Sequence, residues 1–185
     1  MRVAVTGTPG TGKTTATDLL ATDLDVVHLN EVIEEEGLST GRDEERGSLV
    51  ADMDALAEWL ADRDDAVVES HLAHHFDADR VVVLRAHPDT VVERLRERGD
   101  ADSKAYENAG SAEPPRALTR KARENAESEA LDVVLSAAVQ RHGRDSVYEI
   151  DTTDREPDAV AAEISAVVAG EREPSAGTVD YVDWL

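Results

Sequence analysis

Short apolar runs alternate with segments of helical periodicity along the whole chain. The apolar runs are each about four residues long and predict buried strands at 3–6, 26–29, 66–69, 81–84 and 147–150. Apolar residues at helical spacing predict helices at 13–23, 30–37, 49–62, 88–98, 117–142 and 157–169. This alternation predicts an α/β fold, in which helices cover both faces of a five-stranded parallel sheet.

Capping and helix-breaking residues suggest where several of these elements end. Asn30 is a favourable N-cap, and Gly37 and Gly99 predict helix ends. Residues 38–48 are polar and predict a loop. Residues 100–116 carry two prolines and a glycine and predict an exposed flap.

Two further segments leave alternatives open. Residues 117–142 fit either one long helix or two. The tail after Gly170 ends in an apolar cluster around Tyr181 and Trp184, which could pack back on the domain or dock a partner.

A glycine-rich motif follows the first predicted strand. Residues 7–14 read GTPGTGKT and fit G-x-x-x-x-G-K-[ST], the phosphate-binding P-loop. Gly7, Gly10 and Gly12 let the backbone bend so that its N–H groups face phosphate oxygens. The N-terminus of the next predicted helix adds a partial positive charge. The motif therefore predicts a site for ATP with Mg²⁺.

Three side chains at the end of this motif carry specific expectations. Lys13 is expected to reach the β- and γ-phosphates, Thr14 to hold Mg²⁺, and Thr15 to offer a hydroxyl to the α-phosphate. Lys13 is one of three lysines in the chain, with Lys104 and Lys121. The planar guanidinium group of an arginine cannot replace the compact ammonium group of Lys13 inside the loop.

The third predicted strand ends in Glu69-Ser70-His71, at the sheet edge where sites of this fold lie. Glu69 could orient the Mg²⁺ shell, act as a base, or be an ordinary edge carboxylate. His71 could relay a proton or be a surface residue. The nearby His74 and His75 form no recognisable metal-binding helix pattern.

Two arginines lie four residues apart on the helix predicted at 88–98. Arg94 and Arg98 share one helix face that opens onto the flap and could close over transferring phosphates. The alternative is a solvated face on which Glu93 and Glu97 pair with them. Arg85, after the fourth strand, could be structural.

Residues 30–46 hold seven acidic residues against Arg42 and Arg46, so these two arginines are the candidates there for an acceptor phosphate. Either arginine could equally be a surface residue.

The composition excludes some kinds of chemistry and disfavours some partners. The 185 residues include 41 Asp and Glu, 19 Lys and Arg and no Cys, with a net charge of −22. Disulfides and thiolate chemistry are excluded, and broad contact with DNA phosphates is disfavoured. The acidity fits adaptation to high salt, which we favour, or binding of a basic partner. Neither a membrane span nor a signal peptide is evident, so a cytoplasmic protein is expected.

The combined motifs resemble a known family. TGTPGTGKTT, GLSTGRDEE, Glu69-Ser70-His71, VVVLRAHPDTVVERLRERG and KARENAESEAL are similar to archaeal members of the atypical adenylate kinases, the coilin-interacting nuclear ATPase group. The similarity spans about residues 1–170. It implies a nucleoside-monophosphate-kinase fold, with a monophosphate-binding lobe at 29–52, a lid at 98–120 and a separate tail at 171–185.

The resemblance also implies roles for individual residues. ATP would be held by Gly10, Gly12, Lys13, Thr14 and Thr15, with Arg98 closing from the lid. The candidate catalytic residues are Lys13, Glu69, His71 and Arg98, and the candidate Mg²⁺ ligands are Thr14 and Glu69.

The implied activity is conversion of ATP and AMP to two ADP, together with ATP hydrolysis. Relatives assist late maturation of the small ribosomal subunit and its 16S rRNA through transient pre-ribosome association, and bind a basic ribosomal protein of the platform. Two alternatives are an ATPase switch with little kinase activity and a kinase for a small metabolite, which the acidic acceptor region disfavours.

The chain departs from the family pattern in three places. Glu69 stands where the family usually has Asp, and Glu34 aligns with a position where relatives often have Arg. The lid looks enlarged at about 101–118, and the tail after residue 170 looks like an addition.

Overall fold

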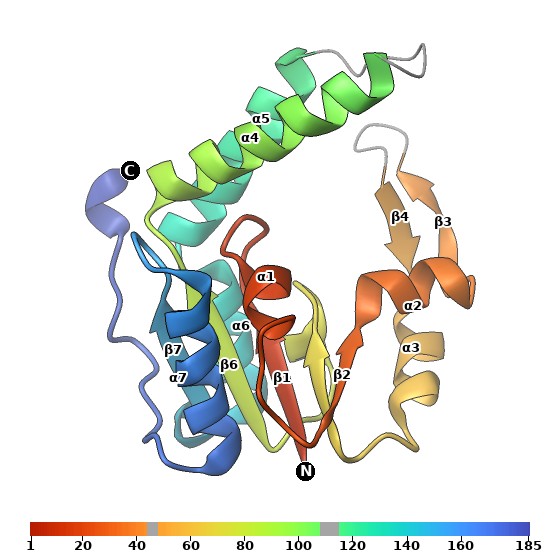
Figure 1. Cartoon of the computed structure of the whole chain (residues 1–185), viewed down its shortest axis with the longest axis vertical. Helices are drawn as coiled ribbons and strands as arrows, with labels where there is room; N and C mark the ends of the chain where they lie inside the picture. Colours follow the sequence, from red (N-terminus) through yellow and green to blue (C-terminus); the bar gives the residue numbers. More distant parts are fainter. Residues whose placement is uncertain (44–47, 108–114) are drawn as a thin grey trace.

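A central parallel sheet organises the molecule (Figure 1). The computed structural model describes residues 1–43, 48–107 and 115–185. Within these residues the sheet has five strands in the order β2-β5-β1-β6-β7, and all neighbouring strands are parallel. The strands are β1 (Arg2–Thr6), β2 (Asp25–His28), β5 (Ala66–Glu69), β6 (Arg80–Arg85) and β7 (Val147–Asp151). The predicted fold class is therefore confirmed.

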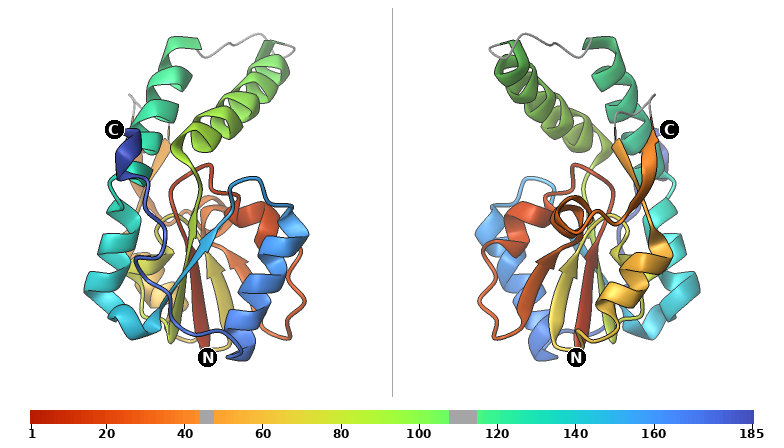
Figure 2. Two further views of the ribbon diagram at one scale, coloured as in Figure 1. Left: turned by 90° about the vertical axis from the view of Figure 1, so that its left-hand side faces the viewer. Right: turned by 90° about the vertical axis from the view of Figure 1, so that its right-hand side faces the viewer.

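Helices cover both faces of the sheet, and each face has its own core (Figure 2). One face packs against α1 (Lys13–Thr17) and α7 (Pro157–Ala169). The other packs against α2 (Leu29–Glu35), α3 (Met53–Leu60) and α6 (Val133–His142). Successive residues of β1 point to opposite faces, so Val3 and Val5 lie in one core and Ala4 in the other.

Two predicted helices start or end elsewhere. The helix predicted at 13–23 ends at Thr17. The Thr17 hydroxyl donates to the carbonyls of Lys13 and Thr14, and such bonds compete with the helical pattern. The next helix begins at Leu29, so His28 and not Asn30 is its N-cap. Asn30 lies within that helix, and its Oδ1 accepts a hydrogen bond of 3.3 Å from the Ser70 hydroxyl.

The segment predicted as a loop at 38–48 contains strand structure. β3 (Ser39–Asp43) pairs with antiparallel β4 (Ser48–Ala51), and residues 44–47 lie outside the described part. The helix predicted at 49–62 begins only at Met53, because Asp52 caps it by accepting from the Ala55 N–H at 3.0 Å. The prediction that residues 49–52 are helical was therefore wrong.

A long helical hairpin rises from the carboxyl end of the sheet (Figure 1). α4 (Pro88–Glu107) packs against α5 (Pro115–Ala130), and η1 (Ala73–His75) and η2 (Arg144–Ser146) are short 3₁₀ turns elsewhere. α4 continues through Gly99, so the helix end predicted there was wrong. Packing between the two helices outweighs the low helix propensity of glycine. Of the predicted flap, residues 100–107 are helical and residues 108–114 lie outside the described residues.

The segment at 117–142 forms two helices, which settles the alternative left open by the sequence. α5 ends at Ala130 and α6 begins at Val133. Between them, Asp132 adopts a φ of 53°, a left-handed conformation that Asp tolerates better than most residues.

A buried ion cluster lies where β6, β7 and α5 meet. The Arg85 side chain is 1% exposed and donates to Glu129 Oε1 at 2.6 Å, to Glu149 Oε1 at 2.5 Å and to Asp132 Oδ1 at 2.5 Å. Burial opposes the positive charge, but these three carboxylates outweigh it and raise the pKa of Arg85. Arg85 is therefore a structural residue.

The tail packs back on the domain. The N–H groups of Thr178 and Val179 donate to Glu149 Oε2 at 2.7 and 3.3 Å. The Tyr181 hydroxyl lies 3.2 Å from Thr153 Oγ1. In the last turn, η3 (Val182–Trp184), the Trp184 indole donates to Asp89 Oδ1 at 2.9 Å.

None of the helices described here is both long enough and apolar enough to cross a membrane.

Replacing Arg85 with Met should lower the free energy of unfolding by about 3–5 kcal/mol, because two buried glutamates lose their cation. Urea unfolding in molar potassium chloride measures this. Arg141→Met is the matched control, since Arg141 forms an exposed ion pair with Asp77 at 2.9 Å and should cost less than about 1 kcal/mol. Equal losses for the two variants would contradict the structural role of the cluster.

Candidate active site

The P-loop lies between β1 and α1, at the carboxyl end of the central strand. Gly7, Gly10 and Gly12 have φ values of 144°, 97° and 85°, which side-chain-bearing residues rarely adopt. A Cβ atom on Gly7 would also lie 2.4 Å from the Leu84 carbonyl oxygen of the neighbouring strand. The predicted glycines therefore form a tight backbone loop of the kind that can surround phosphate groups.

Lys13 is buried beneath this loop. Its Nζ donates to the carbonyl oxygens of Gly7 at 2.9 Å and Thr8 at 3.2 Å. Burial lowers the pKa of Lys13 to about 8, although Glu69 and Glu129 partly oppose the shift. A buried ammonium at the floor of the loop can neutralise a phosphate anion there.

The structure brings Thr14 and Glu69 together, as the sequence predicts for a shared metal. The Thr14 hydroxyl donates to Glu69 Oε2 at 3.3 Å, and the Glu69 side chain is 4% exposed. Mg²⁺ binds oxygen atoms and commonly takes only one or two protein ligands, with phosphates and waters completing its shell. Thr14 and Glu69 fit this requirement. No larger cluster of His, Cys, Asp or Glu suited to a metal occurs among the described residues.

His28 is a site residue that sequence analysis missed. Its Nδ1 lies 3.0 Å from Glu69 Oε2, and its Nε2 lies 3.2 Å from Asp18 Oδ1. β2 pairs with β5 in a register that puts His28 opposite Glu69. The signal in the sequence was that His28 lies near the end of a predicted strand. The contact with Glu69 could be predicted only by knowing that β2 and β5 are neighbours.

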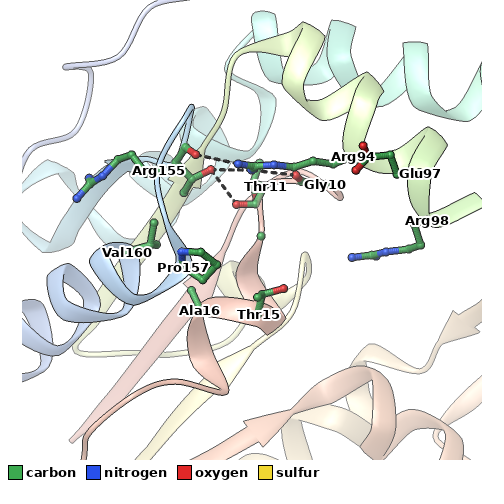
Figure 3. A pocket seen from close by; sticks show the side chains of 12 residues that line it. Gly10, Thr11, Thr15, Ala16, Arg94, Glu97, Arg98, Arg155, Pro157 and Val160 are labelled. Carbon is green, nitrogen blue, oxygen red and sulfur yellow. Dashed lines mark hydrogen bonds between the residues drawn. The ribbon is translucent and has the colours of Figure 1, made fainter. Parts of the chain in front are cut away.

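A cavity of about 370 Å³ opens on one side of the P-loop (Figure 3). Its lining joins the P-loop and α1 to α4 and to the loop after β7: Gly10, Thr11, Gly12, Thr15, Ala16, Arg94, Glu97, Arg98, Thr152, Arg155, Pro157 and Val160. The last four of these were not predicted. They come from the loop after β7 and from the start of α7.

The two predicted arginines of α4 behave differently (Figure 3). The Arg94 guanidinium donates to Thr152 O at 2.9 Å and to Thr152 Oγ1 at 3.1 Å, and Thr152 Oγ1 donates to Thr11 O at 3.0 Å. Arg94 therefore braces α4 against the P-loop. The Arg98 side chain extends from α4 toward the open side of the cavity, where it can meet a bound anion.

A second cavity, of about 580 Å³, lies under the β3–β4 hairpin and α2. Ile33, Leu49, Val50, Met53 and Leu72 give it an apolar lining, and its polar lining is Asn30, Glu34, Arg42, Asp43 and His71. The structure thus places Arg42 on the predicted acceptor lobe, whereas Arg46 lies outside the described residues.

The histidines after β5 have different environments. His71 lines the second cavity, and desolvation and the nearby Lys13 charge lower its pKa. His74 is buried, and its Nδ1 lies 2.9 Å from Thr6 Oγ1. Burial lowers the pKa of His74 to about 4, so it is a neutral histidine of the core.

Comparisons with known proteins show the family and the fold of this chain. The chain matches the AAA domain family over residues 3–132. In fold it is similar to shikimate kinase from Bacteroides thetaiotaomicron, with a TM-score of 0.56, 19% identity, and 91% and 98% of the two chains covered. Shikimate kinase from Acinetobacter baumannii gives a TM-score of 0.55 at 15% identity, with coverage of 92% and 94%. The family match and the loop therefore define a P-loop protein, and its fold is similar to that of shikimate kinases.

The sequence relatives are more specific. Proteins of Natronomonas pharaonis and Halobacterium salinarum are 63% and 57% identical to this chain, with 100% of each chain covered. A protein of Methanothermobacter thermautotrophicus is 38% identical, with 99% of this chain and 98% of its own covered. All three carry the name "Putative adenylate kinase". This chain belongs to that archaeal family.

The affinity of the loop for ATP should fall as the pH rises above about 8, because the free Lys13 ammonium then loses its proton. The dissociation constant should increase by up to about tenfold per pH unit until the pKa of the complex is reached. Calorimetric titrations at pH 7 and pH 9.5 test this. Lys13→Met should bind weakly at both pH values, and a wild-type affinity that is equal at both would contradict the prediction.

Proposed function

We propose that this protein is a Mg²⁺-dependent adenylate kinase that transfers a phosphoryl group from ATP to AMP. The carrying observation is that the P-loop lines one cavity beside α4 and α7, while His71, which senses the charge of Lys13, lines a second cavity under α2 and the β3–β4 hairpin. The name of the archaeal relatives supports the same activity.

ATP is assigned to the cavity of about 370 Å³. Backbone N–H groups at Gly10 and Gly12 and the hydroxyl of Thr15 face the phosphates. Pro157 and Val160 offer an apolar surface to the base, and Arg155 lies beside them, held by Glu163 and the Asp151 carbonyl.

Mg²⁺ is assigned to Thr14 and Glu69, and when bound it supplies charge neutralisation between the phosphates. His28 holds the Glu69 carboxylate from the neighbouring strand at 3.0 Å. The longer Glu69 side chain, at a position where the family usually has Asp, is accommodated by this contact.

Phosphoryl transfer then depends on position and charge. An oxygen of the AMP phosphate attacks the γ-phosphorus, and the bond from that phosphorus to the bridging oxygen breaks. ADP leaves with the bonding electrons, and the AMP phosphate becomes the second ADP. The ionised attacking oxygen needs no base. Lys13 and Arg98 offset the charge that develops on the transferred group and the leaving oxygen.

A second activity, ATP hydrolysis, is supported by the arrangement around β5. His71 lines the acceptor cavity and Glu69 lies beside Thr14, so both can order a water molecule when no acceptor is bound. The resemblance to the coilin-interacting nuclear ATPase group supports this activity. It also supports a cytoplasmic role in small-subunit and 16S rRNA maturation, with a basic platform protein as partner.

The surface charge has two proposed explanations. A net charge of −22 suits a basic protein partner, and it equally suits a high-salt environment, where the Debye length is about 3 Å in molar salt. A small-metabolite kinase is disfavoured, because Glu34 and Asp43 accompany Arg42 in the acceptor cavity.

AMP should stimulate ATP consumption strongly, with two ADP formed for each ATP consumed. The assay measures ADP from ATP and Mg²⁺ in molar potassium chloride, with AMP, with other nucleoside monophosphates, with shikimate, or with no acceptor. Lys13→Ala should abolish turnover in every arm. Slow turnover indifferent to AMP would favour the hydrolytic activity, and stimulation by shikimate alone would overturn the proposal.

His71→Ala should slow ATP hydrolysis by about 100-fold while leaving the dissociation constant of ATP within about threefold, because the residue acts on a proton and not on the loop. Steady-state hydrolysis and calorimetry give the two values. His75→Ala is the control, as His75 lies on η1 away from both cavities beside the P-loop. Equal losses of affinity and rate would make His71 structural.

A further inference from the structure

The inner face of α5 carries a polar stripe that the proposed mechanism does not use. Lys121, Asn125 and Ser128 are spaced four and three residues apart, so they lie on one side of the helix. All three are partly buried and line a third cavity, of about 500 Å³. Thr8 and Pro9 of the P-loop and His71 of the β5 loop line the same cavity.

The outer face of α5 has a different character. Arg120 pairs with Glu124 at 3.8 Å and Arg123 pairs with Glu127 at 3.2 Å, all as i,i+4 ion pairs on largely exposed side chains. Arg120 and Arg123 thus lie on the outer face of α5, whereas Lys121 lies on the inner face. Glu124 also reaches the rim of the cavity, where Arg120 offsets its charge.

The tip of the P-loop separates this third cavity from the ATP cavity. Gly10 and Gly12 line the cavity that contains Arg98 of α4, and Thr8 and Pro9 line the cavity that contains Lys121 of α5. Each arm of the helical hairpin therefore places cationic side chains on its own side of the loop: α4 places Arg94 and Arg98, and α5 places Lys121.

The third cavity adjoins the acceptor cavity, because His71 lines both. A nucleotide whose nucleoside occupies the acceptor cavity would direct its phosphate past His71 toward Thr8 and Pro9. That phosphate must meet the γ-phosphate at the same tip, which is where the inner stripe of α5 lies.

We propose that Lys121 and Asn125 bind the phosphate group of the acceptor nucleoside monophosphate. This inference rests on the proposed function, and it assigns the acceptor phosphate to the α5 side of the P-loop. The Lys121 ammonium supplies a compact positive charge, and the Asn125 amide supplies a neutral N–H donor. The chain contains three lysines, and another of them is Lys13 of the P-loop. Lysine is therefore an uncommon residue in this chain, and two of the three are near the P-loop.

Lys121→Met should raise KM for AMP by about tenfold or more, as expected for loss of a charge-assisted hydrogen bond, with KM for ATP changed less than about twofold. Asn125→Asp keeps the side-chain size but adds a negative charge, and should also raise KM for AMP. Lys121→Arg should restore part of the loss. Arg123→Met, on the outer face of the same helix, is the matched control and should leave both KM values unchanged.

Calorimetric titration of AMP alone and of ATP alone separates this inference from the proposed function. If the wild type binds AMP without transferring phosphate, the adenylate kinase proposal fails, and weaker AMP binding by Lys121→Met still supports the assignment. Equal effects on AMP and ATP, no effect on AMP, or wild-type protein that binds no nucleoside monophosphate would each overturn it. Urea unfolding of each variant shows whether a loss reflects the site or the fold.

Discussion

The arrangement of the site depends on the ion pairs that the Arg85 guanidinium group forms. This group binds the buried carboxylates of Glu129 and Glu149 and the partly exposed carboxylate of Asp132, and each of these fixes a different segment. The second oxygen of Glu129 accepts from the Thr8 hydroxyl at 2.5 Å, which ties α5 to the P-loop. Asp132 lies at the break between α5 and α6, and Glu149 receives N–H groups of the tail. Because a lone buried carboxylate is costly, these segments are stable only in each other's presence.

This cluster also sets what α5 can present to the site. Glu129 fixes the rotation of the helix near its end, so residues one and two turns earlier have a fixed direction. On α4, Arg94 fixes the helix against the P-loop by its hydrogen bond to Thr152, which in turn donates to Thr11. Both arms of the hairpin are thus braced at their bases near the P-loop. The fold is shared with shikimate kinases, so the fold by itself does not decide the substrate.

The sequence predicted those parts of the site that depend on local patterns. The P-loop is contiguous, and Glu69 follows an apolar strand, so their meeting at Thr14 needed only the knowledge that strand ends share an edge. His28, Thr152 and Arg155 were missed because their proximity to the site follows from the strand order and from the path of the chain after β7. The β3–β4 hairpin was missed because its strands are short and lie apart from the central sheet, with Leu49 and Val50 exposed. Gly99 was misjudged because contacts between helices, invisible in a local pattern, outweigh propensity.

The depressed basicity of Lys13 gives this chain an unusual chemical reactivity. An amine with a pKa of about 8 is partly unprotonated near neutral pH, whereas an ordinary lysine is almost entirely protonated there. Only the unprotonated amine attacks an electrophile. In the protein without nucleotide, a small acylating reagent therefore meets, in Lys13, one of three lysine amines, and the basicity of this amine is lowered. A bound phosphate stabilises the ammonium form of Lys13 and removes this reactivity. Nucleotide should therefore protect Lys13 from acylation by charge as well as by covering it.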